Sequence, residues 1–209
     1  MPYRHISRNL LLSAFAAGSA IALSAFTPLS DEIAQPATQP ICPGDQNIAA
    51  ETTTRIAEFP SLKTKVTIPT NFRTLLYNDG TIAILHPVDF NLIQCLALGR
   101  PVFGTDALQS TNLRLVPHSE GISPQEYATN LNISGFTLSE PTVMQTTHGI
   151  QVVIREATGQ SGLALESAYA WYQPTDVDGI VEVSTTTKAE LLDVLNRMQL
   201  SNTDLSTGT

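Results

Sequence analysis

The chain has few basic residues. Lysine and arginine together number 11 of its 209 residues, whereas aspartate and glutamate number 19, so the formal net charge is −8. Proteins that bind nucleic acid or anionic membrane surfaces rely on clustered lysine and arginine to displace counterions. The composition therefore argues against either kind of partner.

The chain also lacks the spaced motifs that carry much catalytic and metal-binding chemistry. It contains no HExxH pair, no GxSxG elbow, no P-loop and no dinucleotide fingerprint. His86, His118 and His148 lie about 30 residues apart, which is typical of surface histidines beside turns and gives no metal-ligand spacing. We therefore assign no metal site.

A nucleophile is equally hard to assign. His118 and Ser119 could be combined on paper with Asp106 or Glu120 into a catalytic triad, but a chain of this composition offers many such triples. No catalytic residue is assigned for that reason, and no cofactor is expected.

Three further features have a plainer structural interpretation. Asp176 and Asp178 could contribute oxygens to Ca²⁺, but the longer loop with a terminal glutamate is missing, which favours an exposed turn. The sequon at 132–134 matters only in a eukaryotic secretory pathway. Aromatic residues on a strand are mostly core, although these could line a pocket: Tyr169, Trp171 and Tyr172.

The first residues have the composition of an export signal. Arg4 and Arg8 precede an apolar run over residues 10–20, and Ala20-Ile-Ala22 supplies an A-x-A cleavage site. The alternative is an uncleaved anchor extending to Phe26, which at about 17 residues is near the short limit for crossing a bilayer. We expect a signal peptide at 1–22, and hence a protein of the periplasm, thylakoid lumen or extracellular space.

Composition divides the remainder into three parts. Residues 23–47 are rich in Pro, Thr and Gln without periodicity, which predicts a flexible tether. Residues 48–200 are long enough for a single domain with its own core, and residues 201–209 form a polar tail expected to be disordered. Without the leader, nine basic residues face 19 acidic ones, a net charge of −10.

Patterning over the first part of the domain favours β-structure. Asn78-Asp-Gly80 lies between two apolar runs and predicts a hairpin. The segment 88–98 is ambiguous between strand and helix, and 48–59 is expected to contain a short helix. The other expected elements are strands at 63–68, 72–77, 81–85 and 110–118 and a loop at 100–109.

The second part shows clearer signals. Ser123 followed by Pro124 and Glu126 predicts a helix start, and Thr187 with Glu190 predicts a capping box for a C-terminal amphipathic helix reaching Leu200. Small residues on one face of the run 163–172 leave room for a helix. The remaining expected strands are 136–146, interrupted by Pro141, then 149–158, 163–172 and 180–185.

This order of elements resembles the PsbP-like superfamily over residues 63–200. The similarity lies in Val66-Thr-Ile-Pro-Thr-Asn-Phe72, the turn at Asn78-Asp-Gly80, the helix after Ser123 and the closing run 191–200, while 88–104 departs from it. The resemblance implies an α+β fold: an α/β/α sandwich around a mainly antiparallel twisted sheet of about six strands, with the C-terminal amphipathic helix packed on it. It also implies a non-enzymatic adaptor.

The sequence therefore favours an exported, non-enzymatic binding or assembly module whose partner is a protein, with a membrane complex as a candidate. Membrane contact is expected only through an uncleaved leader. One alternative is a carrier of a small ligand or metal that uses the aromatic strand or an acidic site. A second, weaker alternative is an exported hydrolase.

The two cysteines give a prediction of their own. In an oxidising compartment Cys42 and Cys95 are expected to form a disulfide, the alternative being a buried inert Cys95 and an exposed Cys42. Closing a loop of about 53 residues stabilises a fold by about 4 kcal/mol in the loop-entropy model. Mass spectrometry of unreduced peptides should find the bridge, and Cys42→Ser should lower the free energy of unfolding by about that amount. Two free thiols in the exported protein would contradict the prediction.

Overall fold

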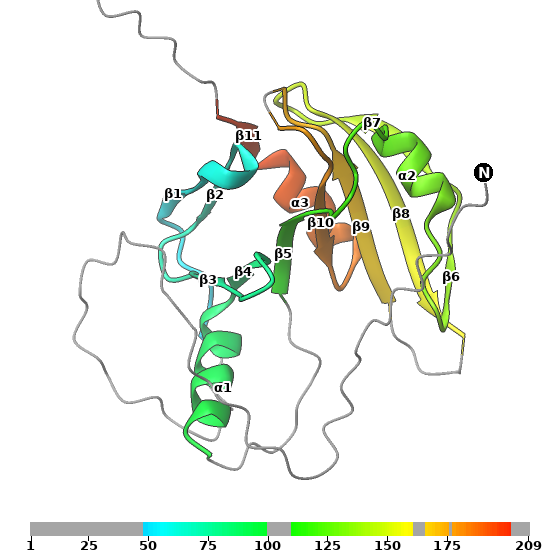
Figure 1. The fold of residues 1–209 in the computed structure, drawn as a ribbon. Coiled ribbons are helices and arrows are strands. Elements are labelled where there is room, and N and C mark those ends of the chain that lie inside the picture. Colours follow the sequence, from blue (N-terminus) through cyan, green and yellow to red (C-terminus); the bar gives the residue numbers. More distant parts are fainter. Residues whose placement is uncertain (1–47, 100–109, 161–165, 176, 202–209) are drawn as a thin grey trace, which may run out of the picture.

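A computed structural model describes residues 48–99, 110–160, 166–175 and 177–201 (Figure 1). The expected signal peptide, tether and loop at 100–109 lie outside these residues, as does the tail from 202. The helices are α1 (Pro87–Ala97), α2 (Pro124–Asn130) and α3 (Lys188–Asn196). The strands are β1 (Thr54–Phe59), β2 (Thr64–Pro69), β3 (Arg73–Leu76), β4 (Ile82–Leu85), β5 (Ser110–Leu115), β6 (Phe136–Leu138), β7 (Thr142–Gln145), β8 (Gln151–Gly159), β9 (Glu166–Tyr172), β10 (Val181–Thr185) and β11 (Met198–Leu200).

The strands form two sheets, so the chain has an α+β fold. The larger sheet has eight strands in the order β3-β4-β5-β10-β9-β8-β6, with β7 also paired to β8. The smaller sheet has the order β1-β2-β11. The described pairs are antiparallel throughout. The expectation of one sheet of about six strands was too low: the larger sheet alone has eight strands, and β1, β2 and β11 form a second sheet.

Local sequence signals correctly placed the turns and caps. Asp79 accepts a hydrogen bond from the Thr81 backbone N–H (2.9 Å) in the turn between β3 and β4, and Gly80 there has a φ of 81°. Thr187 and Glu190 form the expected capping box at the start of α3. These interactions span only a few residues, which is why the sequence predicts them.

Three expectations about elements are corrected or resolved by the structure. The segment expected to contain a short helix at 48–59 instead forms strand β1, in which Ala57 and Phe59 point inward and Ile56 outward. The ambiguous segment 88–98 is helical as α1. The last helix ends at Asn196, because the chain then pairs with β2 as the short strand β11.

One face of the larger sheet is apolar and fully covered. Leu191 and Leu195 of α3 pack on the small residues Ala168 and Ala170 of β9, as the sequence predicts. The smaller sheet covers the rest of this face and contributes five side chains to the same core: Phe59, Leu62, Val66, Ile68 and Met198. On the larger sheet this core includes Ile82, Ile84, Leu113, Val152, Ile154, Val181 and Val183.

A buried hydrogen bond joins the two sheets. The Tyr172 hydroxyl of β9 and Thr64 Oγ1 of β2 are 2.6 Å apart, and Thr64 also donates to the Leu62 carbonyl. Burial raises the pKa of Tyr172 above its ordinary value. The neutral phenol is therefore the form that the folded state accommodates.

Among the described residues, the helices α1 and α2 cover the two ends of the opposite face of the larger sheet (Figure 1). Ala128 of α2 packs over β8 and β9, against Val153 and Trp171. Phe90 of α1 packs over β3 and β4, together with Ile93, against a small cluster: Leu75, Ala83 and Leu85. Strands β5 and β10 run between these two covered regions.

No helix in the described part of the chain is long and apolar enough to cross a membrane.

The raised pKa of Tyr172 predicts a loss of stability at alkaline pH. Above about pH 10 an unfolded tyrosine loses its proton while the folded one retains it, so the free energy of unfolding falls by up to about 1.4 kcal/mol per pH unit. Tyr172→Phe should cost about 1 kcal/mol at pH 7 and reduce this slope. Tyr77, whose pKa burial also raises, leaves a residual slope. Urea titrations from pH 7 to 11 measure both effects, and an unchanged slope in Tyr172→Phe would contradict the assignment.

Candidate functional site

The middle of the second face of the larger sheet, between α1 and α2, carries a row of polar side chains. Arg114 of β5 lies directly opposite Glu182 of β10, and Asn112 lies opposite Ser184. We call these four residues the polar strip. Their immediate neighbours along each strand, such as Val183, point to the covered apolar face, because successive side chains of a strand alternate between faces.

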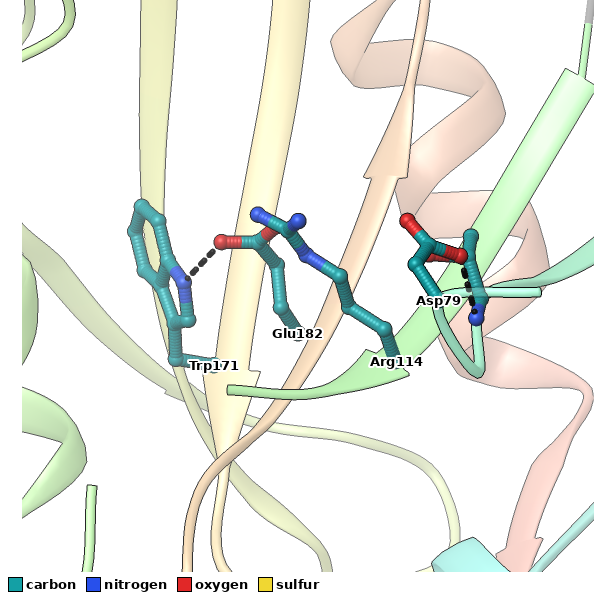
Figure 2. Close-up of polar contacts among 5 residues, drawn as sticks. Asp79, Arg114, Trp171 and Glu182 are labelled. Atoms are coloured by element: carbon teal, nitrogen blue, oxygen red, sulfur yellow. Dashed lines mark hydrogen bonds and ion pairs between the residues drawn. The ribbon is translucent and has the colours of Figure 1, made fainter. Parts of the chain in front are cut away.

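Glu182 is the buried centre of the strip (Figure 2). Its side chain is only 4% exposed. Arg114 donates from Nε to its Oε1 at 2.8 Å, and Nη2 of the same guanidinium lies 2.8 Å from Oε1. The indole Nε1–H of Trp171 donates to its Oε2 at 2.9 Å. Trp171 is the register partner of Glu182 on β9, so the three side chains form one row across three neighbouring strands.

A buried carboxylate in this position is costly. Removing an ion pair from water costs more than many such pairs regain, and apolar replacements of both partners are often neutral or stabilising. Glu182 is accommodated because both of its oxygens accept hydrogen bonds from oriented donors. Stability alone therefore gives little reason for a carboxylate here, which makes the row a candidate for function.

Arg114 presents part of its guanidinium to solvent. Its side chain is 31% exposed. Its hydrogen bond to Glu182 uses Nε and its ion-pair contact uses Nη2, and within the described residues Nη1 makes no hydrogen bond. Figure 2 shows Asp79 on the side of Arg114 away from Glu182, with its carboxylate held by the β3–β4 turn. The strip therefore holds a cation that Glu182 fixes on one side and that stays partly open to solvent.

The comparisons with known proteins leave this geometry as the basis for any functional argument. No family model, curated protein or solved structure matches the chain.

The aromatic residues beside the strip fill core space. Trp171 is completely buried, and its ring stacks on Tyr169 with centroids 5.8 Å apart and an interplanar angle of 5°. Tyr127 of α2 meets the indole edge-on at 5.9 Å. Tyr172 points to the opposite face of the sheet. The pocket considered for these aromatic residues is therefore occupied by their own packing.

Ser119 has a structural role. It is buried, and its hydroxyl donates to the Val116 carbonyl and accepts from the Ile180 N–H, both at 2.8 Å. A Cβ added at Gly179 would lie only 3.1 Å from Ser119 Oγ, so the two turns are closely packed. This hydroxyl is committed to the fold, while Asp106 lies outside the described residues.

The three histidines lie in three separate connections between elements. His86 caps α1, with Nδ1 accepting from the Val88 N–H at 3.3 Å, and its ring meets Phe72 edge-on. His118 and His148 lie in the turns after β5 and before β8. The described residues contain no group of three or more His, Cys, Asp or Glu placed to hold a metal.

Several expected sites fall partly or wholly outside the described residues. Cys95 is buried in α1, whereas Cys42 is not described, so their bridge stays a prediction. Asp176 is likewise not described, and Asp178 is exposed. Asn132, the sequon residue, is exposed between α2 and β6.

Sequence patterning did not identify Arg114 and Glu182 as a pair. In the sequence, each is simply a polar residue that alternates with apolar residues in its own strand. The two are 68 positions apart, so no local spacing links them. One signal was available, because Glu182 is a single acid between Val181 and Val183 in a short apolar strand.

The ion pair makes a stability prediction. Arg114→Ala leaves a buried carboxylate without its cation and should lower the free energy of unfolding by about 3 to 5 kcal/mol. Replacing both Arg114 and Glu182 by leucine should cost less than Arg114→Ala, because it removes both charges and leaves only the Trp171 indole N–H without an acceptor, which costs about 1 to 3 kcal/mol. The control is Lys65→Ala, which breaks an exposed pair with Glu58 and should cost about 1 kcal/mol or less. Denaturant titration measures the free energy of unfolding of all three variants. A loss in Arg114→Ala no larger than that in Lys65→Ala would contradict the account.

Proposed function

We propose that the protein is an exported, non-enzymatic binding or assembly module for a protein partner, which docks on the face that carries the polar strip. The contrast between the two faces of the larger sheet carries this proposal. One face is closed by α3 and the smaller sheet over a continuous apolar core. The other leaves half-exposed polar side chains between α1 and α2.

Helix α1, which packs on this face of the sheet, also exposes apolar side chains at its C-terminal end. Phe90 and Ile93 anchor it to the sheet, but Leu96 and Leu98 remain 52% and 60% exposed. Surfaces through which proteins bind one another typically combine exposed apolar side chains with polar groups. The polar strip would then supply specificity and α1 the apolar contact.

The sequence supports the location and class of this proposal. The leader-like N-terminal segment supports export, and the net charge of −8 disfavours nucleic acid as the partner. The PsbP-like resemblance rests on the order of elements; it supports an α/β/α sandwich and an adaptor associated with a membrane complex. We include both in the proposal.

A second candidate function is a carrier of a small ligand. A surface hollow of about 530 Å³ lies at the β7–β8 hairpin and is lined by Val143, Met144, Gln145, Gly149 and Gln151. A set of apolar ligands and metal salts tested by thermal shift would detect it. A rise in Tm that Met144→Gln abolishes would favour the carrier over the adaptor.

The adaptor proposal predicts a specific loss of binding. The purified tagged protein should retain a partner from its own compartment, and Leu96→Asp with Leu98→Asp should reduce the partner recovered at least about fivefold, since charged groups would enter an apolar contact. The matched control is Ile56→Asp on β1, where an equally exposed side chain (59%) lies on the smaller sheet. Circular dichroism checks that both variants fold.

Equal losses in the control and the α1 variant would contradict a role for this face. Turnover of ester, peptide or phosphate substrates by the wild-type protein would contradict the non-enzymatic assignment.

A further inference from the structure

We propose that Arg114 binds a carboxylate group through the edge of its guanidinium that Glu182 leaves open. The inference deepens the proposed function and rests on it, because it names the chemistry of the group that the polar strip would recognise. It is argued from the geometry of one ion pair and its surroundings.

The hydrogen-bonding capacity of Arg114 is only partly used. A guanidinium has five N–H groups in a planar fork. Glu182 Oε1 takes Nε and one N–H of Nη2, which leaves the two N–H groups of Nη1 and one of Nη2. These three point along adjacent edges of one plane, the arrangement that holds the two oxygens of a carboxylate. With its side chain 31% exposed, Arg114 can be reached from solvent.

The guanidinium is also held in position before any ligand arrives. Oε1 of Glu182 fixes the inner edge of Arg114, and Trp171 fixes Glu182 by donating to Oε2. Trp171 is in turn packed between Tyr169 and Tyr127. A flexible surface arginine would have to lose its rotamer freedom on binding, whereas this one has already lost it on folding.

The charges around Arg114 select among anions. Glu182 lies directly against it, so a doubly charged phosphate would be repelled more strongly than a monoanion. Asn112 and Ser184, which complete the strip, are neutral groups able to hydrogen-bond a planar ligand. A carboxylate, with one charge and two coplanar oxygens, matches both constraints.

The site contains its own reporter. Trp171 is the single tryptophan of the chain, and its indole N–H donates to the carboxylate that holds Arg114. A ligand that binds Arg114 will change the electrostatic environment of this N–H. One resolved indole signal in a ¹H–¹⁵N spectrum therefore follows the site without ambiguity.

The experiment titrates the full exported protein with sodium acetate and, separately, with a short amidated peptide whose only charged group is one glutamate. Ionic strength is held constant with sodium chloride. A saturable shift of the Trp171 indole signal is expected with at least one probe. Binding by acetate alone identifies a small organic acid as the source, and tighter binding by the peptide identifies a protein partner. A linear, non-saturating response to both would overturn the proposal.

Two variants test whether Arg114 is the binding group. Arg114→Lys keeps the positive charge beside Glu182 but removes the planar set of N–H donors of the guanidinium. It should therefore weaken binding of the carboxylate at least about tenfold. Lys65→Gln removes one positive charge from the smaller sheet and should leave the titration unchanged. If Arg114→Lys binds as tightly as the wild type, the proposal fails. This titration contains no partner protein, so a linear response rejects only the inference about Arg114. The proposed function is tested separately by the amount of partner that the Leu96→Asp and Leu98→Asp variant recovers.

Discussion

The structure depends on the strict alternation of side chains along β5 and β10. Leu113, Val181 and Val183 point to one side of the larger sheet, which forces α3 and the smaller sheet to cover that side. Arg114 and Glu182, one position away along the same strands, are thereby placed on the other side. A shift of register by one residue would exchange the two sets and remove both the core and the polar strip. The fold and the candidate site therefore follow from the same pairing.

Glu182 links stability to the proposed activity. A carboxylate that is almost completely buried is retained only if its hydrogen bonds are made, and Trp171 and Arg114 both donate to it. The same two bonds hold the guanidinium at the surface in one orientation. A well-packed apolar pair is often at least as stabilising as a buried ion pair. The ion pair instead fixes a cation in one orientation on an otherwise acidic protein. The leucines of α1 would supply the apolar area that such a small polar site lacks.

Local signals predicted the elements that local interactions form. Thr187 with Glu190, Ser123, and the turn at Asp79 each involve partners within four residues, and each is present as expected. The strand β11 was missed because Met198 continues the apolar spacing of the helix, while its partner Val66 lies far away in the sequence. The Arg114–Glu182 pair was missed for the same reason. Non-local pairing decides which outward-facing charge becomes buried, and alternation within a single strand carries no information about it.

The central claim is that the face with the polar strip, and not the outer face of the smaller sheet, meets the partner. A photo-crosslinking amino acid placed at Asn112 on β5 and, in a second protein, at Thr67 on β2 tests it directly in the cell of origin. Both side chains are half-buried, so the two probes are matched in exposure. The account predicts a discrete crosslinked protein from position 112 and none from position 67. A discrete adduct from position 67 alone, or the same adduct from both, would contradict it.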